Sequence, residues 1–230
     1  MLESENLKPS LLKQLTFLLL SCGISIGLIG IVYLKFTSSM PQSMEKIPTD
    51  HPLVMEDGDP YIRALMRTIT YSEANVSYPY NVIYRGEKIV DLSQHPEKCV
   101  PIPNTEFCST AAGRYQFLNF TWYEKAEKYH PKPTGMLWWK SYSFEAEYQD
   151  IVAYSWLNDP NAWGFDIAQR LKNKEENDVF CDLSGTWTSL PCGDEINVNT
   201  GKLLTQIYPK RLKEECAKQP DQCSEIDQPG

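Results

Sequence analysis

The feature that most constrains this chain is a run of twenty residues without a charge, LTFLLLSCGISIGLIGIVYL, at positions 15–34. A helix of this length crosses a hydrocarbon layer of roughly 30 Å, so the run predicts one transmembrane helix over 14–35. A cleaved signal peptide is the alternative, but the apolar run is long for one and no Ala-x-Ala site follows it. We therefore expect an uncleaved membrane anchor, preceded by a short cytoplasmic segment, 1–13.

The cysteines orient this anchor, because the lysines on its two sides do not. Six of the seven cysteines fall into three pairs that are close in sequence: Cys99 with Cys108, Cys181 with Cys192, and Cys216 with Cys223. None of the pairs has the C-x-x-C spacing that is typical of metal sites. Three local disulfides are the simplest interpretation, and disulfides form in oxidising compartments. The chain beyond the anchor is therefore expected outside the cytoplasm.

Length and charge limit what the rest of the chain can be. The chain has 230 residues, of which 42% are hydrophobic, and this allows one ordinary domain with appendages. Its net charge of -8 provides no broad basic surface, so nucleic acid is not an expected partner. The proline-containing segment 36–57 predicts a tether, 58–213 a folded domain, and 214–230 an acidic tail closed by a disulfide.

One stretch of the domain, Asp59–Glu73, ends an apolar helical stripe with a carboxylate. Asp59 can cap the helix and Pro60 suits its first position. Apolar residues recur at helical spacing and Glu73 continues their stripe: Ile62, Leu65, Met66 and Ile69. Partial burial and the negative end of the helix dipole both favour the protonated carboxyl, which suits a proton donor. The alternative is that Glu73 points outward from a fraying helix end.

The remaining pattern predicts an α+β fold that is mainly α. A small β-hairpin is expected where the sequence alternates around Arg85-Gly86. Helical spacing predicts four further helices. The first is a run that ends at Tyr129 and has Ser109 or Thr110 as its cap. The others are Ser143–Leu157, Trp163–Leu171 and about Thr200–Ala217.

Several kinds of enzyme are excluded by the residues that the chain lacks. There is no HExxH, P-loop or GxSxG motif and no GxGxxG after a strand, and the three histidines are scattered. We therefore expect no metal and no cofactor. Carboxylate chemistry in an aromatic-rich domain outside the cytoplasm remains, and aromatic side chains suit sugar stacking as well as an ordinary core.

A series of motifs in a particular order follows Glu73. The motifs are Tyr71-Ser72-Glu73, Tyr80-Asn81-Val82-Ile83, Gly86-Glu87, Asp91 to Pro96, Ser109 to Gln116 reading STAAGRYQ, Trp122, and Gly185 to Pro191 reading GTWTSLP. In this order they resemble the phage-lambda-type lysozymes, or endolysins, over about 58–210. The resemblance implies a lysozyme-like fold and a lytic transglycosylase that acts on peptidoglycan. The anchor, tether, disulfides and acidic tail are additions to the family pattern.

The resemblance also implies roles for individual residues. Glu73 matches the catalytic glutamate, and Gln116 with Tyr115 matches the element that lines the sugar cleft. The full set of expected substrate-binding residues is Gln116, Tyr115, Ser72, Tyr80, Asp91 and Thr110. A protonated Glu73 would donate to the bond between N-acetylmuramic acid and N-acetylglucosamine. As a carboxylate it would then activate the muramic acid C6 hydroxyl, which leaves a 1,6-anhydro end.

Two other interpretations stay open. If Asp91 faces Glu73 across the cleft, the chain is a hydrolytic muramidase with two carboxylates; otherwise Asp91 caps or braces the hairpin. A non-catalytic peptidoglycan-binding module of an envelope complex is the second alternative. The expected partners are peptidoglycan glycan strands, the inner membrane and proteins of an envelope complex. The anchored acidic domain predicts local wall remodelling at a bacterial inner membrane, with a phage lysis protein as a further possibility.

Overall fold

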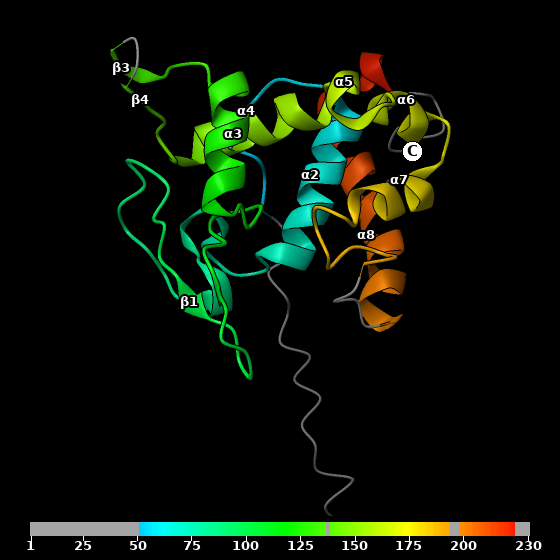
Figure 1. Ribbon diagram of the computed structural model, residues 1–230. Coiled ribbons are helices and arrows are strands. Elements are labelled where there is room, and N and C mark those ends of the chain that lie inside the picture. The colour runs from blue at the N-terminus through cyan, green and yellow to red at the C-terminus, as the bar shows by residue number, and fades with distance from the viewer. Residues whose placement is uncertain (1–50, 137–138, 194–197, 224–230) are drawn as a thin grey trace, which may run out of the picture. The chain divides into compact units, whose positions relative to one another are not determined.

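The computed structural model describes residues 51–136, 139–193 and 198–223, all within one unit that covers 47–230. The predicted cytoplasmic segment, transmembrane helix and most of the tether lie outside these residues. No helix in the described ranges is both long and apolar enough to cross a membrane. In chain order the elements are α2 Pro60–Glu73, β1 Val100–Pro101, β2 Cys108–Ser109, α3 Asn119–Tyr129, β3 Thr134–Met136, β4 Trp139–Ser141, α4 Ala146–Leu157, α5 Pro160–Trp163, α6 Ile167–Lys172, α7 Glu176–Leu183 and α8 Val198–Lys218 (Figure 1).

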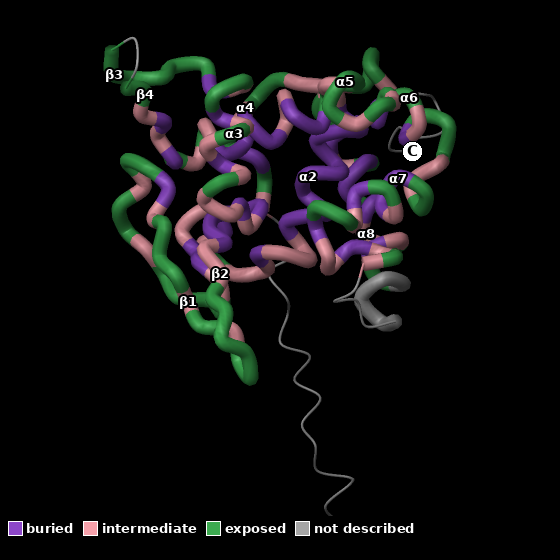
Figure 2. Tube along the Cα trace, in the orientation of Figure 1, coloured by how far each residue is buried: buried purple, intermediate pink, exposed green. Residues whose placement is uncertain are grey.

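Helix α2 is the central element of the domain. Every residue from Pro60 to Thr70 is buried, and Figure 2 shows the helix as a buried segment among the other helices. The Asp59 carboxylate caps it by accepting from the Tyr61 backbone N–H at 2.9 Å. The predicted start, end and cap of this helix are confirmed. Because α2 is buried on all sides, its polar side chains need partners inside the domain.

Helix α8 supplies partners for the two arginines of α2. Arg63 Nε donates to Glu215 Oε2 at 2.7 Å, and Arg67 Nη1 donates to Glu215 Oε1 at 2.7 Å. Burial alone would raise the pKa of Glu215, but hydrogen bonds from Arg63 and Lys218 hold it below its ordinary value. The predicted acidic tail, 214–230, was expected to lie beyond the domain. This boundary is wrong for its first residues, because Glu215 is a buried part of the packed helix.

The described end of the predicted tether, 51–57, is bound to the domain. Arg114 Nη1 donates to the Pro52 carbonyl at 2.9 Å, and Asp150 Oδ2 accepts from the Val54 backbone N–H at 2.7 Å. Both Arg114 and Asp150 are fully buried. These bonds satisfy the side chains of Arg114 and Asp150, which would otherwise be costly to bury. Because they come from 51–57, the folded domain begins before the predicted boundary at 58.

The remaining helices follow the predicted pattern, with two differences. The helix predicted to begin at Trp163 begins at Ile167, as α6, because Trp163 ends the preceding helix α5, Gly164 adopts a left-handed conformation and Asp166 caps the new start. Helix α7 has no predicted counterpart. Helices α3, α4 and α8 overlap the segments that periodicity predicts.

The β structure consists of short hairpins. The predicted turn is present, since Arg85 and Gly86 both have positive φ and Ile83 N–H donates to the Glu87 carbonyl at 2.9 Å. The predicted hairpin strands are not formed, because the flanking chain makes the 3-10 turns Pro79–Asn81 and Tyr84–Gly86 and a single antiparallel bridge between Val82 and Lys88. Strands β1 and β2 pair antiparallel, as do β3 and β4. The sequence did not predict these two hairpins, because strands of two or three residues are too short for periodicity. The three predicted disulfides are confirmed, Cys99–Cys108, Cys181–Cys192 and Cys216–Cys223.

Candidate active site

Glu73 is the last residue of α2, and its side chain is half-buried. The Ser189 hydroxyl donates a short hydrogen bond to Glu73 Oε1. The helix stops here because Ala74 leaves helical geometry while its N–H still donates to the Thr70 carbonyl at 2.8 Å. A carboxyl group is therefore placed at the end of a rigid, buried helix, with a hydroxyl partner from a distant segment.

That distant segment is the loop after α7, which contains the GTWTSLP motif. The Cys181–Cys192 disulfide joins the last turn of α7 to the end of this loop. The Trp187 indole N–H donates to the Tyr115 backbone carbonyl at 3.0 Å, and the Trp187 ring packs against the Trp156 ring with centroids 5.5 Å apart. The loop thus contacts both Glu73 and the segment that contains Gln116.

The segment with Gln116 is a tight turn. Ala112 and Phe117 pair through two backbone hydrogen bonds of 3.0 and 2.9 Å. Gly113 has φ +72°, and a Cβ at this position would lie 2.2 Å from Gln149 Oε1, so only glycine fits. Gln116 also has positive φ, and its Nε2 donates to the Gly113 carbonyl at 2.8 Å.

The side-chain oxygen of Gln116 can accept a hydrogen bond from a ligand. Within the described residues, both hydrogen bonds of this side chain use Nε2, to Gly113 and to Val82. The oxygen Oε1 can therefore accept a hydrogen bond from a hydroxyl or amide of a ligand. Gln116 is half-buried, which is consistent with the predicted position at the wall of a cleft.

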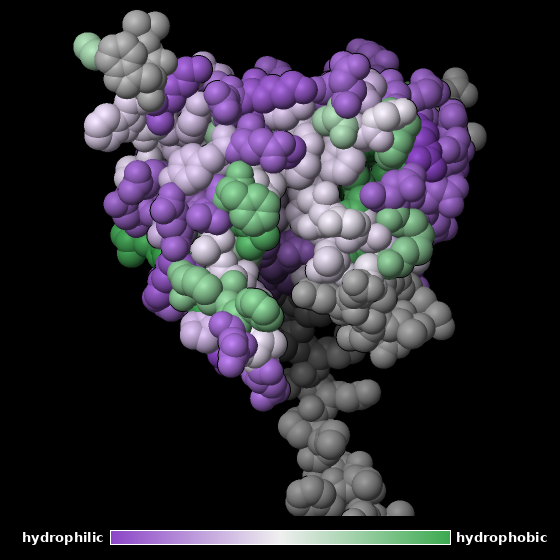
Figure 3. Space-filling view, in the orientation of Figure 1, coloured by the Kyte–Doolittle hydropathy of each residue, from purple (hydrophilic) through white to green (hydrophobic). Residues whose placement is uncertain are grey.

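Figure 3 shows that this face of the domain is hollowed. The hollow separates the side that carries the β1–β2 hairpin from the side that carries α7 and α8. In the same view, the C-terminal turn of α2 ends beside the hollow, and hydrophilic side chains line its floor. A hollow lined by hydrophilic side chains suits a polar ligand.

Tyr115 was predicted to bind sugar, and the structure places its side chain inside the domain. Its side chain is fully buried and its hydroxyl donates to Asp150 Oδ1 at 2.6 Å. Burial, followed by the charge of Asp150, raises the pKa of Tyr115 well above its ordinary value, so the phenol stays a donor. Within the turn, Tyr115 is buried, whereas the next residue, Gln116, is half-buried.

Tyr80 belongs to the same buried network. Its hydroxyl donates to Asp150 Oδ2 at 2.7 Å and accepts from Arg114 Nη1 at 2.8 Å. Burial, with Asp150 nearby, also raises the pKa of Tyr80. Through Arg114, Tyr80 supports the Gln116 turn from behind, and its expected contact with substrate stays a prediction.

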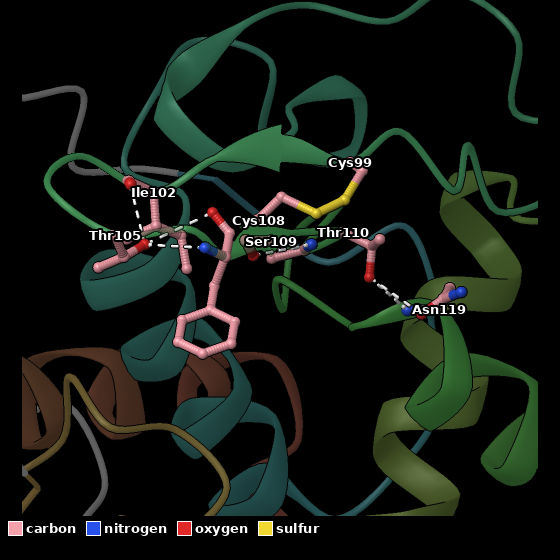
Figure 4. Close-up of a disulfide and its surroundings, with 9 residues drawn as sticks. Cys99, Ile102, Thr105, Cys108, Ser109, Thr110 and Asn119 are labelled. Carbon is pink, nitrogen blue, oxygen red and sulfur yellow. Dashed lines mark hydrogen bonds between the residues drawn. A yellow bond between two sulfur atoms is a disulfide. The ribbon is translucent and has the colours of Figure 1, made fainter.

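Ser72 and Thr110 also bond within the fold. Ser72 Oγ donates to the Ile69 carbonyl of its own helix at 3.0 Å. Thr110 Oγ1 accepts from the Asn119 backbone N–H at 3.1 Å, next to the disulfide that closes β1 and β2 (Figure 4). The prediction that Ser109 or Thr110 is the cap residue of this helix is wrong, because α3 begins at Asn119 and its N-cap residue is Leu118. Both hydroxyls therefore bond within the fold, and the expected contacts of the two residues with substrate stay predictions.

Asp91 is an exposed residue. Its carboxylate accepts from the Ser93 backbone N–H at 2.9 Å, which holds the pKa of Asp91 below its ordinary value. Asp91 lines a shallow depression of about 330 Å³ together with hairpin and loop residues that include His95 and Pro96. This geometry matches the alternative in which Asp91 braces the hairpin.

His95 supports the loop that follows Asp91. Nδ1 accepts from the Glu97 backbone N–H at 3.1 Å, so Nε2 carries the proton and donates to the Phe117 carbonyl at 2.9 Å. Burial lowers the pKa of His95, so the ring is neutral at neutral pH. In the described ranges, no group of three or more His, Cys, Asp or Glu residues could hold a metal ion.

Ser189 is the site residue that sequence reasoning missed. The GTWTSLP motif contributed to the family resemblance, but none of its residues received a role. A signal was present, since the motif lies between Cys181 and Cys192, and a loop closed by a disulfide is held in one place. Its contact with Glu73 joins residues 116 positions apart, which no local pattern predicts.

Comparisons with known proteins agree with this geometry. A family model described as Endolysin matches residues 63–211. The endolysin of Escherichia phage lambda is 32% identical over 119 residues, which cover 50% of this chain and 63% of that protein. The chain thus spans less than two thirds of the length of this curated relative.

Two solved structures of bacteriophage lambda lysozyme have the same fold. One is described as a complex with a chitohexasaccharide and has a TM-score of 0.51, and the other has a TM-score of 0.50. Each is 24% identical and covers 68% of this chain and 97% of the lysozyme. The described domain is therefore lysozyme-like and mainly helical with small sheets.

Proposed function

This chain belongs to the endolysin family, and on that premise we propose that it is a peptidoglycan lytic transglycosylase. The bond cleaved joins N-acetylmuramic acid to N-acetylglucosamine. The observation that carries the proposal is the placement of Glu73 at the end of α2, with the Ser189 loop tied both to it and to the Gln116 turn. A solved relative described with a bound chitohexasaccharide supports a β-linked sugar strand as the ligand.

The reaction requires one carboxyl group that serves first as acid and then as base. Protonated Glu73 donates to the glycosidic oxygen while an oxocarbenium-like state develops at C1 of the muramic acid. The resulting carboxylate takes the proton from the C6 hydroxyl of the same sugar, and O6 attacks C1. An internal nucleophile removes the need for a second carboxylate to activate water. The Asp91 carboxylate is exposed and accepts from the Ser93 backbone N–H, a bracing contact that supports this mechanism over hydrolysis.

Product analysis on purified sacculi tests the proposal. We expect muropeptides that end in 1,6-anhydro-N-acetylmuramic acid, identified by mass spectrometry. Glu73→Gln should keep the fold and reduce the rate by about a thousandfold or more, because the amide cannot transfer a proton. Reducing ends that carry one added water would support the muramidase instead. Sacculus binding without any cleavage would support a binding module.

We further propose that residues 14–35 anchor the enzyme in the inner membrane with the domain outside the cytoplasm. The uncharged run and the three disulfides of the domain support this location. An anchored enzyme suits local wall remodelling, and envelope proteins would be its neighbours. After cell fractionation, the full chain should resist carbonate extraction from membranes, while a chain that lacks 1–36 should be released. Release of both chains would contradict the anchor.

A further inference from the structure

The Ser189 hydroxyl is held in place by several contacts of its loop. The Trp187 side chain is buried and its indole N–H is bonded to the Tyr115 carbonyl at 3.0 Å. Leu190 is fully buried on the other side of Ser189. A rigid donor at this position limits the orientations open to the Glu73 carboxyl.

The backbone at the end of the loop is also held by close contacts. Gly193 N–H donates to the Leu190 carbonyl at 2.9 Å, and a Cβ on Gly193 would lie 2.1 Å from the Thr188 carbonyl oxygen. This backbone approach requires glycine. Together with the Cys181–Cys192 disulfide, it constrains the backbone that carries Ser189.

The chemistry of the pair explains why a hydroxyl is useful here. A hydroxyl that donates to a carboxylate oxygen stabilises the ionised form more than the protonated form. An acid that must release its proton to a glycosidic oxygen benefits from this preference. The same bond fixes the side-chain torsions, which lowers the cost of aligning the carboxyl with the scissile bond.

We propose that Ser189 is a positioning residue for Glu73, one that orients its carboxyl group and stabilises the carboxylate formed when the proton is donated. This inference rests on the proposed role of Glu73 as acid and base. Ser189 acts through Glu73, so it changes the rate of the chemical step and leaves substrate binding unchanged.

Kinetics of three variants test the role of Ser189. Ser189→Ala should lower kcat about tenfold with KM unchanged, as expected for loss of one charge-assisted hydrogen bond in the transition state. The alkaline limb of the pH profile should move up by about one unit, because the carboxyl then holds its proton more tightly. Ser189→Thr keeps the hydroxyl and should restore most of kcat. Thr188→Ala removes a hydroxyl one position away and is the matched control. Its kcat, KM and pH profile should equal those of the wild type.

Other outcomes would overturn the proposal. A rise in KM alone would make Ser189 a substrate contact. Equal rate losses in Ser189→Ala and Thr188→Ala, with an unmoved pH profile, would make the loop a purely structural support. Thermal denaturation of each variant checks that the fold is intact before the rates are compared.

A second measurement does not depend on catalysis. The Glu73 side-chain carboxyl carbon is labelled with 13C and titrated by NMR in the wild type and in Ser189→Ala, with Glu73→Gln used to assign the signal. The titration midpoint should be higher by about one pH unit in Ser189→Ala. An unchanged midpoint overturns the pairing of Ser189 with Glu73. Absence of sacculus cleavage by the wild type, with a shifted midpoint, would instead overturn the proposed function.

Discussion

Two carboxylates, Glu73 and Asp91, decide which reaction this domain performs. Glu73 is held by a hydroxyl at the end of a buried helix, whereas Asp91 is exposed and accepts from the Ser93 backbone. Asp91→Asn should keep the rate of sacculus cleavage within about twofold of the wild type, since surface substitutions rarely change energies by more than about 0.5 kcal/mol. Initial rates with muropeptide detection measure this. A loss as large as that of Glu73→Gln would return Asp91 to the role of base or nucleophile.

His95 makes the stability of the domain depend on pH. Burial lowers its pKa from the ordinary value of 6.5, so the unfolded chain takes up a proton at a higher pH than the folded domain. The contribution of His95 to the free energy of unfolding is therefore complete above about pH 6.5 and declines as the pH falls below it, by at most about 1.4 kcal/mol per pH unit.

Urea denaturation at a series of pH values measures this effect. His95→Gln should be less stable than the wild type at neutral pH, and its stability should fall less between pH 6.5 and 5. His130, whose pKa burial also lowers, should account for part of the slope that remains. Parallel curves for the two proteins would exclude His95 as the source.

At the scale of elements, the segment 51–57 is a structural part of the active-site support. It provides acceptors for the buried Arg114 and donors for the buried Asp150, and both of these residues also hold Tyr80. The Gln116 turn is therefore fixed from behind by a segment that lies before the first described helix. A chain beginning at residue 58 would lack this segment. The buried charges of Arg114 and Asp150 would then have fewer hydrogen-bond partners.

Truncation should consequently destabilise the domain. A chain beginning at 58 should lose about 3–5 kcal/mol relative to one beginning at 47, because removal of the partners of buried charges is costly. For a domain of this size the loss corresponds to a fall in Tm of about 10 °C or more. Thermal denaturation of the two chains measures the difference. Equal Tm values would show that water replaces the lost partners.

The disulfides differ in what their loops contain. Cys181 and Cys192 close the loop that places Ser189 on Glu73, whereas Cys216 and Cys223 close the end of α8. Replacing either pair by serine should cost about 2–3 kcal/mol of stability, since the closed loops are of similar length. Loss of the first pair should also lower kcat, while loss of the second should leave kcat unchanged. Equal effects of the two replacements on kcat would show that the Cys181–Cys192 loop has no particular role in catalysis.

At the scale of the whole molecule, the net charge of -8 opposes an anionic substrate. Stem peptides give peptidoglycan many carboxylates, and salt screens the repulsion as the Debye length falls from roughly 30 Å at 0.01 M to roughly 8 Å at 0.15 M. Cleavage of sacculi should therefore become faster over this range. Binding of a neutral chitohexasaccharide is the control and should not depend on salt. A rate that falls with salt would point to a local basic surface that attracts the wall.

The sequence by itself determined the features that depend on near neighbours. Asp59 and Pro60 define the start of α2, Arg85-Gly86 the hairpin turn, and cysteine spacing the three disulfides. Caps, turns and short loops are governed by interactions within a few residues, so spacing and residue type suffice. The order of motifs likewise placed Glu73 and Gln116 in one family pattern.

Only the tertiary structure decided which side chains meet. It placed Ser189 on Glu73 across 116 positions, and it placed Glu215 in the core beside Arg63, across 152 positions, where the sequence predicted a tail. It also turned Tyr115 inward to Asp150. The physical reason is that a buried polar group takes whichever partner the packing of helices brings within hydrogen-bond distance, and that packing is a property of the whole fold.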